Sequence, residues 1–215
     1  MKSLFYKTIL SGIFAGSFIF ADAQKADAKS AKILDAAASN YKSKKNIYFK
    51  FSLGTGENGK VQQTQTGTFY AAASKYNLKI MGIEQISDGS KVYNISAEDQ
   101  EITIAKAENS EMIFSPINYL NSYKKDYNTT YVGKKNVNGT SVDLMKLIPA
   151  KNNGVKQVYI YVNSAKNQIV KIEQYAADNS ISIISVTEYK ENQTLNPSLF
   201  IFNKNNYKNY IITEL

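Results

Sequence analysis

The sequence predicts a mainly β fold with some α structure: a single curled antiparallel sheet of about 10–11 strands, lidded by an N-terminal helix and a short central helix. Apolar residues recur with a 3.6-residue period near the N-terminus, and from Asn46 onward they alternate with polar residues along most of the chain. Short turn signals separate the alternating segments. Such short connections join antiparallel neighbours, because parallel strands need a longer crossover.

A helix is expected over residues 25–42, which are rich in helix-forming side chains. Four of its residues fall on one apolar stripe: Ala31, Leu34, Ala38 and Tyr41. A short central helix is expected over 117–125, because Ser115 and Pro116 before it suit the N-cap and the first helical position.

Strands are expected where the alternating segments lie between turn signals such as Asn58-Gly59, Asp88-Gly89, Asn138-Gly139 and Asp178-Asn179. The expected strands are 46–53, 60–72, 75–83, 91–96, 101–106, 129–134, 140–148, 156–163, 168–176 and 180–189. A last turn near Asn196-Pro197 leads into residues 200–202.

The composition removes several classes of chemistry. The chain has 26 basic residues, all of them lysine, against 18 acidic residues, and it contains no histidine, cysteine or tryptophan. A Ser-His-Asp triad, a cysteine nucleophile and a thiolate or imidazole metal site are therefore excluded. A pair of convergent carboxylates, as in glycoside hydrolysis, stays open as an alternative. Nucleic acid is not an expected partner, since guanine readout favours the arginine that this chain lacks.

Residues 1–23 have the three parts of a secretory signal peptide. Lys2 and Lys7 precede an apolar run over 9–20, and Ala21-Asp22-Ala23 forms a small-residue cleavage site. We expect cleavage after Ala23, which leaves residues 24–215 as a single exported domain. Without cysteine there is no lipobox, so we expect this domain to be free in solution.

The string from Gly54 to Lys60 matches a dinucleotide-binding pattern and most of a P-loop, but its context differs. Both phosphate cradles need a helix directly after the glycines, whereas here a strand-like segment begins at Val61. A hairpin turn at Asn58-Gly59 explains the glycines, and we expect no nucleotide site there.

A sheet of this length is expected to curl, and its concave face would then be too large for its own side chains to fill. Such a covered apolar concavity is a candidate ligand site. The residues expected to line it are Leu34, Phe49, Phe51, Leu53, Phe69, Tyr76, Leu78, Ile80, Val92, Ile117 and Leu120. For each of them an ordinary packed core is the alternative interpretation.

The mature chain resembles the periplasmic outer-membrane lipoprotein carrier family (LolA-like) along nearly its whole length. The segments that carry the resemblance occur in the family's order: Ile33-Leu34-Asp35, Asn46–Leu53, Gln65–Tyr70, Lys75–Ile80, Ile86–Gly89 followed by Val92-Tyr93, and Leu195–Phe202. The Ser-Asp-Gly turn after an apolar strand is the most specific of these features.

The resemblance implies an open half-barrel lidded by helices, with no catalysis and no cofactor. It implies a monomeric carrier that takes lipoproteins from an inner-membrane exporter, shields their acyl chains and passes them to an outer-membrane acceptor. By position in the family, the expected acyl contacts are Leu34, Tyr76, Leu78, Ile117 and Leu120, and Tyr76 also matches a position used toward the exporter.

The chain departs from the family in the loop before residue 75. Well-studied members carry an arginine there that helps to hold the lid shut, whereas Lys75 is the only nearby cation in this sequence. Two alternatives to the carrier stay open: a lipid- or glycolipid-binding or sensing protein of the same fold, and a non-catalytic secreted β-module with a filled core.

Overall fold

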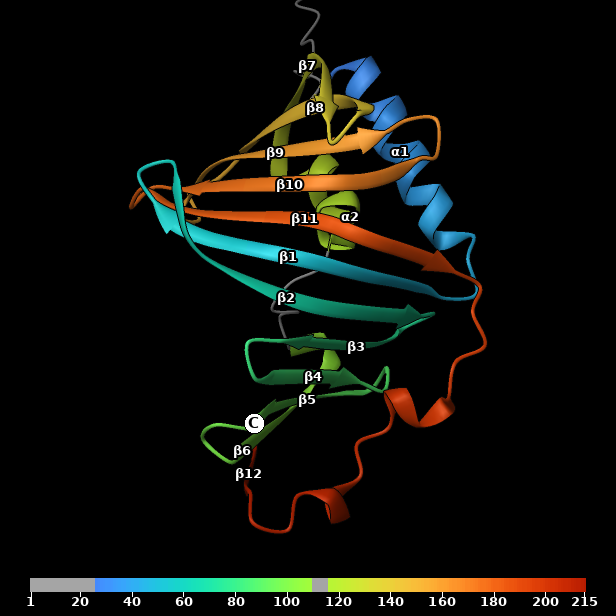
Figure 1. The fold of residues 1–215 in the computed structure, drawn as a ribbon, viewed down its shortest axis with the longest axis vertical. Helices are drawn as coiled ribbons and strands as arrows, with labels where there is room; N and C mark the ends of the chain where they lie inside the picture. Colours follow the sequence, from blue (N-terminus) through green and yellow to red (C-terminus); the bar gives the residue numbers. More distant parts are fainter. Residues whose placement is uncertain (1–25, 110–115) are drawn as a thin grey trace, which may run out of the picture.

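The structure, a computed structural model, describes residues 26–109 and 116–215, which form one sheet of 12 strands and two α-helices (Figure 1). The helices are α1 (Ala28–Lys42) and α2 (Pro116–Asp126). The strands are β1 (Ile47–Glu57), β2 (Lys60–Ala72), β3 (Lys75–Ile80), β4 (Ile83–Ser87), β5 (Lys91–Ser96), β6 (Glu101–Lys106), β7 (Tyr127–Val137), β8 (Thr140–Pro149), β9 (Val155–Asn163), β10 (Gln168–Ala176), β11 (Ser180–Glu191) and β12 (Ile211–Glu214).

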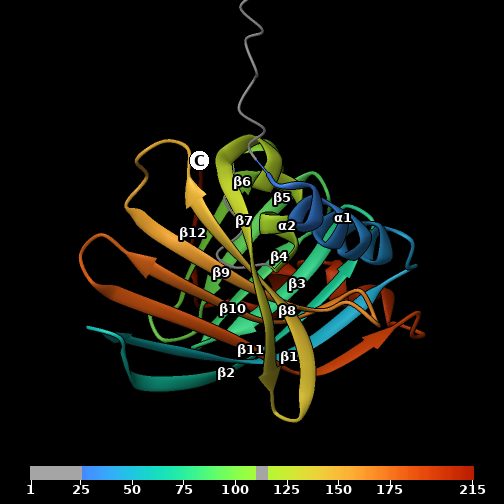
Figure 2. The ribbon, with the colours of Figure 1, turned by 90° about the horizontal axis from the view of Figure 1, so that it is seen from above.

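From edge to edge the strand order is β12-β6-β5-β4-β3-β2-β1-β11-β10-β9-β8-β7. Every neighbouring pair is antiparallel except β12 and β6, which are parallel. The sheet curls around both helices, so it has a concave face toward α1 and α2 and a convex face away from them (Figure 2). The predicted fold class, a curled antiparallel sheet lidded by an N-terminal and a central helix, is confirmed.

Side-chain contacts at both ends hold α1 against the sheet. The Asp27 carboxylate caps the helix by accepting hydrogen bonds from the Lys29 and Ser30 amides at 3.0 and 2.8 Å, and it also accepts the Tyr131 amide of β7. At the other end, the Ile169 amide of β10 donates to the Tyr41 hydroxyl at 2.7 Å. The cap at Asp27 explains why the helix begins at Ala28 rather than at the expected residue 25.

The hairpin between β1 and β2 accounts for the phosphate-loop pattern in the sequence. Asn58 and Gly59 have φ angles of 53° and 76°, which a two-residue type I′ turn requires. β2 follows Gly59 directly, with no helix at that point. This confirms the hairpin and leaves no phosphate cradle there.

Two parts of the sheet differ from the expected strands. The segment expected as one strand over 75–83 ends at Ile80 as β3, because the chain turns at Met81 and Gly82, with φ angles of 54° and 74°. β4, which follows this turn, was not among the expected strands. Near the C-terminus, β12 pairs with the distant β6 although no strand was expected there. The expected N-cap Ser115 and the expected signal peptide over residues 1–23 lie outside the described residues.

Within residues 26–109 and 116–215 there are two apolar cores, one on each face of the sheet. The larger lies between the concave face and the two helices. The smaller consists of Ile86, Ile95, Ile102 and Ile104 on the convex face of β4–β6. The C-terminal segment, residues 197–215, covers the smaller core with Phe202, Tyr207, Tyr210 and Ile212, and the Phe202 ring stacks on Tyr93 at 4.5 Å between centroids.

Candidate functional site

The concave face of the sheet carries a continuous apolar surface beneath the helices. Strand alternation places Phe49, Phe51, Phe69 and Leu78 on this face, and each is at most 1% exposed. Leu34 of α1 is fully buried against the same surface. All the residues expected to line a concavity belong to this one cluster, with Leu53 and Ile117 only partly buried at its margin. Their contact with acyl chains stays a prediction.

An aromatic row crosses the middle of this surface. Phe49 on β1 lies between Tyr189 on β11 and Phe69 on β2, with ring centroids 5.2 and 6.2 Å away. Phe69 in turn stacks on Tyr76 of β3 at 6.1 Å, and Tyr41 of α1 packs edge-on against Phe49 at 5.6 Å. The row links the N-terminal helix to the floor on which it rests.

The sequence interpretation did not include the opposite wall of the concavity. Fully buried side chains of β8–β10 form it: Met145, Leu147, Val158, Ile160, Val162 and Ile172. The alternation within 140–148 and 156–163 could have identified them, because it marks the same two-residue period as in β1. Tyr41 and Tyr189 were also absent from the expected site.

The floor of the concavity becomes polar at β4. The Tyr76 hydroxyl donates to the Gln85 side-chain oxygen at 3.0 Å, and the Gln85 amide donates to Asn94 at 2.6 Å. Burial raises the pKa of Tyr76 to about 12, so its phenol is neutral. These polar side chains therefore interrupt the apolar surface at β4, and on β5 it continues with Val92.

Gly67 on β2 shows how tightly the floor is packed. A Cβ atom at this position would clash with Cζ of Phe51 and lie 3.0 Å from the Lys79 carbonyl oxygen. Because Gly67 has no side chain, the Phe51 ring can lie directly against it on the concave face.

The two helices are joined by a small polar cluster that combines the buried Tyr123 with the exposed Asp35 and Lys124. The Tyr123 hydroxyl and the Lys124 ammonium of α2 each donate to the Asp35 carboxylate of α1 at 2.8 Å. Burial alone would raise the pKa of Asp35, but these two hydrogen bonds outweigh it and hold the pKa below its ordinary value of 3.8. The Lys124 and Asp35 side chains are 61% and 49% exposed, so the ion pair contributes under about 1 kcal/mol.

The sequence interpretation placed lid control at the loop at Lys75, which is a different part of the chain. The Lys75 side chain lies beside Gly89 in the loop between β4 and β5. A part for Lys75 in holding the lid stays a prediction, whereas the contact that joins α1 to α2 is built on Asp35.

We expect Lys124→Ala to increase the opening of the helical cover with little change in the free energy of unfolding, because it removes an exposed ion pair. The chain has no cysteine, so a single Leu34→Cys substitution reports opening through the rate at which a maleimide labels it. In that background Lys124→Ala should speed labelling several-fold, while Lys125→Ala beside it serves as the control. An unchanged rate would exclude Asp35–Lys124 as a latch.

A cavity of about 350 Å³ opens where the two helices meet the sheet. Its apolar lining comes from Tyr41, Ile47, Ala71 and Ile117, and Lys42 and Lys44 also line it. Lys44 is paired with Glu191 at 2.8 Å. The cavity lining therefore combines apolar side chains of the concave cluster with two lysines, one of which is ion-paired.

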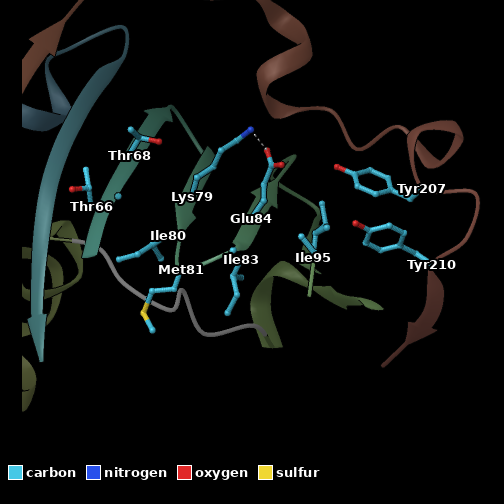
Figure 3. A pocket seen from close by; sticks show the side chains of 13 residues that line it. Thr66, Thr68, Lys79, Ile80, Met81, Ile83, Glu84, Ile95, Tyr207 and Tyr210 are labelled. Carbon is cyan, nitrogen blue, oxygen red and sulfur yellow. Dashed lines mark ion pairs between the residues drawn. The ribbon is translucent and has the colours of Figure 1, made fainter. Parts of the chain in front are cut away.

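A second pocket, of about 430 Å³, lies on the convex face, away from this surface (Figure 3). Thr66 and Thr68 of β2, the Lys79–Glu84 ion pair and the rings of Tyr207 and Tyr210 surround it. It lies where β2 and β3 diverge, beneath the C-terminal segment.

No group of three or more acidic side chains that could hold a metal ion occurs within residues 26–109 and 116–215. Across those same residues, neither helix is long and apolar enough to cross a membrane.

A curled antiparallel sheet with an apolar concave face under two helices defines the half-barrel class of folds. The sequence model of the family described as "Outer membrane lipoprotein carrier protein LolA" matches residues 49–203, and the chain belongs to that family. The expected family is thus confirmed. No curated protein sequence matches this chain significantly.

Several solved structures are similar to this chain at low sequence identity. An uncharacterized conserved protein from Thermus thermophilus is 10% identical, with a TM-score of 0.63 over 87% of this chain and 99% of that chain. A LolA superfamily protein from Nitrosomonas europaea is 9% identical, with a TM-score of 0.41 over 80% and 96%. The lipoprotein LppX from Mycobacterium tuberculosis is 10% identical, with a TM-score of 0.47 over 80% and 99%. The Thermus likeness shows the fold alone.

Proposed function

We propose that this protein is a periplasmic, non-catalytic carrier that shields the acyl chains of lipoproteins between its helices and the concave face of its sheet. It would receive them from an inner-membrane exporter and deliver them to an outer-membrane acceptor. The observation that carries the proposal is the continuous apolar floor from β3 to β8, covered by two helices that a weak exposed ion pair joins. Membership of the carrier family supports it.

The energetics of acyl transfer fit such a surface. Burial of each methylene group contributes about 0.8 kcal/mol to binding, so burial of a whole sixteen-carbon chain in an apolar site contributes roughly 12 kcal/mol. The helices already cover the floor, since the side chains of Leu34, Phe49 and Phe69 are at most 1% exposed. A bound acyl chain would therefore replace contacts between the helices and the sheet. Loading therefore requires α1 or α2 to move away from the floor, which a weak latch permits.

Site-specific photo-crosslinking tests the proposal. A benzophenone amino acid in place of Phe69 lies on the concave face, and the same amino acid in place of Tyr70 lies on the convex face, one residue along β2. We expect irradiation in the periplasm to join the Phe69 variant, and not the Tyr70 variant, to lipoproteins.

The identity of the crosslinked molecule separates the alternatives. Lipoproteins on the Phe69 variant support the carrier, whereas free lipids or glycolipids alone would indicate a lipid-binding protein of the same fold. Equal crosslinking at both positions, or none at Phe69, would contradict a ligand on the concave face.

A further inference from the structure

One long stretch of β2 has a free edge inside the sheet. β2 pairs with β1 from Lys60 to Ala71, but its pairing with β3 covers only Thr68–Ala72. β3 ends at Ile80, and the chain turns away into β4 through Met81 and Gly82. Among the described residues, none pairs with the β3-facing edge of residues 60–67, and the gap between the two strands is visible in Figure 1.

The hairpin register shows which backbone groups face this edge. Two residues separate Ala72 from its partner Lys75, so these two form the hydrogen-bonded pair that closes the hairpin. Backbone groups alternate along a strand, so Thr68, Thr66 and Thr64 direct their N–H and C=O groups to the β3 side. Thr68 meets β3, whereas the groups of Thr64 and Thr66 face the open edge.

The open edge lacks the protection found at the outer edges of the sheet. Natural edge strands are shielded by charges, prolines, bulges, short length or a covering segment. β7 has Lys134, Lys135 and a bulge near Gly133, and β12 is only four residues long. Residues 61–67 of β2 contain no charge and no proline, and residues 60–66 are exposed.

The open edge also borders the end of the apolar floor. Gly67 pairs with Phe51 and Gln65 with Leu53, so the edge lies one strand from the acyl surface. On the concave face the side chains of β2 change from Phe69 to Gln65 and Gln63 along this direction. A molecule that lies across this boundary would have its apolar part on β1 and its polar part at the edge.

We propose that the open edge of β2 binds an extended polypeptide by strand addition, and that this polypeptide is the linker that follows the acylated N-terminal residue of the lipoprotein. The inference rests on the proposed function and specifies how the protein part of the cargo is held. Main-chain pairing suits a carrier of many lipoproteins, because it does not depend on the linker sequence.

The convex-face pocket supports this geometry. This pocket is lined by Thr66–Thr68 and by the Ile80–Ile83 turn (Figure 3). It therefore lies directly beside the position that a strand added to the open edge would occupy. A side chain of the added strand that points to the convex face would enter the pocket. Its lining combines isoleucines, threonines and an ion pair, so it accepts side chains of more than one kind.

The experiment compares Thr64→Pro with Thr64→Ala, since only the proline removes the outward N–H group. Proline is tolerated on a strand where its missing N–H faces solvent, so both variants should fold. The probe is a diacylated cysteine followed by a ten-residue linker of Ser, Gly, Thr and Gln. We expect Thr64→Pro to weaken its binding about tenfold and Thr64→Ala to leave it unchanged.

Two further probes separate the linker from the lipid. A diacylated cysteine without a linker should bind both variants equally, and the lipopeptide with an N-methylated linker should bind the unsubstituted protein about tenfold more weakly. The N-methylated probe needs no variant, so it tests the inference even if Thr64→Pro fails to fold. Gln65→Pro, whose N–H faces β1, should lower the melting temperature and thereby checks the register.

Equal binding of the two lipopeptides to the unsubstituted protein would overturn strand addition, even if the acyl probe binds. Strand addition would also be overturned if the unsubstituted protein formed a dimer that Thr64→Pro converts to monomers. The edge would then pair with a second copy of the chain. Failure of the acyl probe to bind would instead refute the proposed function. Protection of residues 60–67 from hydrogen exchange by the linker peptide alone would still support strand addition.

Discussion

A Leu53→Glu substitution is expected to abolish the retention of acyl chains while the protein stays folded. Leu53 lies at the partly buried margin of the concave floor. The carboxylate of a glutamate at this position therefore reaches water when no ligand is bound. An acyl chain on this surface would leave the charge unpaired against hydrocarbon, which costs several kcal/mol. Native mass spectrometry with lipid extraction, on protein purified from the periplasm, should show bound lipid reduced by more than about a hundredfold.

The adjacent Ser52→Glu substitution is the matched control. Ser52 lies on the same strand and pairs with Thr66, but its side chain points to the convex face. Ser52→Glu adds the same charge one residue away but on the opposite face of the sheet, so we expect lipid retention to be unchanged. Retention of lipid by Leu53→Glu would show that acyl chains do not lie on this part of the floor.

Much of the fold could be predicted because it is encoded in short segments. The alternation of Phe49, Phe51 and Leu53 determines which face of β1 is buried, and Asn58-Gly59 determines where the chain reverses. Neither signal depends on any distant residue. The same local patterns brought the expected concave residues into one cluster.

The features that sequence reasoning missed depend on distant pairings. Ile102 and Ile104 alternate as in a strand with one buried face, but the segment that covers them lies about a hundred residues later. The Asp35–Lys124 contact joins two helices that are separated in the sequence by strands β1–β6, and no spacing rule connects these residues. The open edge of β2 exists only because β3 ends early, where Met81 adopts a left-handed conformation that is uncommon for a residue with a side chain.

Truncation of the chain after Gln193 is expected to cause the largest loss of stability. The C-terminal segment covers Ile86, Ile95 and Ile102, which are at most 5% exposed. Uncovering several such side chains together with the stacked rings costs on the order of 5 kcal/mol or more. The total stability of a domain is about 5–15 kcal/mol, so most of it would be lost. Urea denaturation should show a lower midpoint, and the exposed convex face should make the protein aggregate.

A chain that ends at Tyr210 is the control, because it removes β12 and keeps Phe202, Tyr207 and Tyr210 on the convex core. Ile211 is 65% exposed, so this shorter truncation should cost far less. The family match ends at residue 203, so Tyr207 and Tyr210 lie beyond the region that the family model describes. If the chain cut after Gln193 were as stable as the one cut after Tyr210, β4–β6 would not depend on this cover. A large difference would show that this chain stabilises the β4–β6 end of its half-barrel from the convex side, because the segment that covers Ile86, Ile95 and Ile102 lies there.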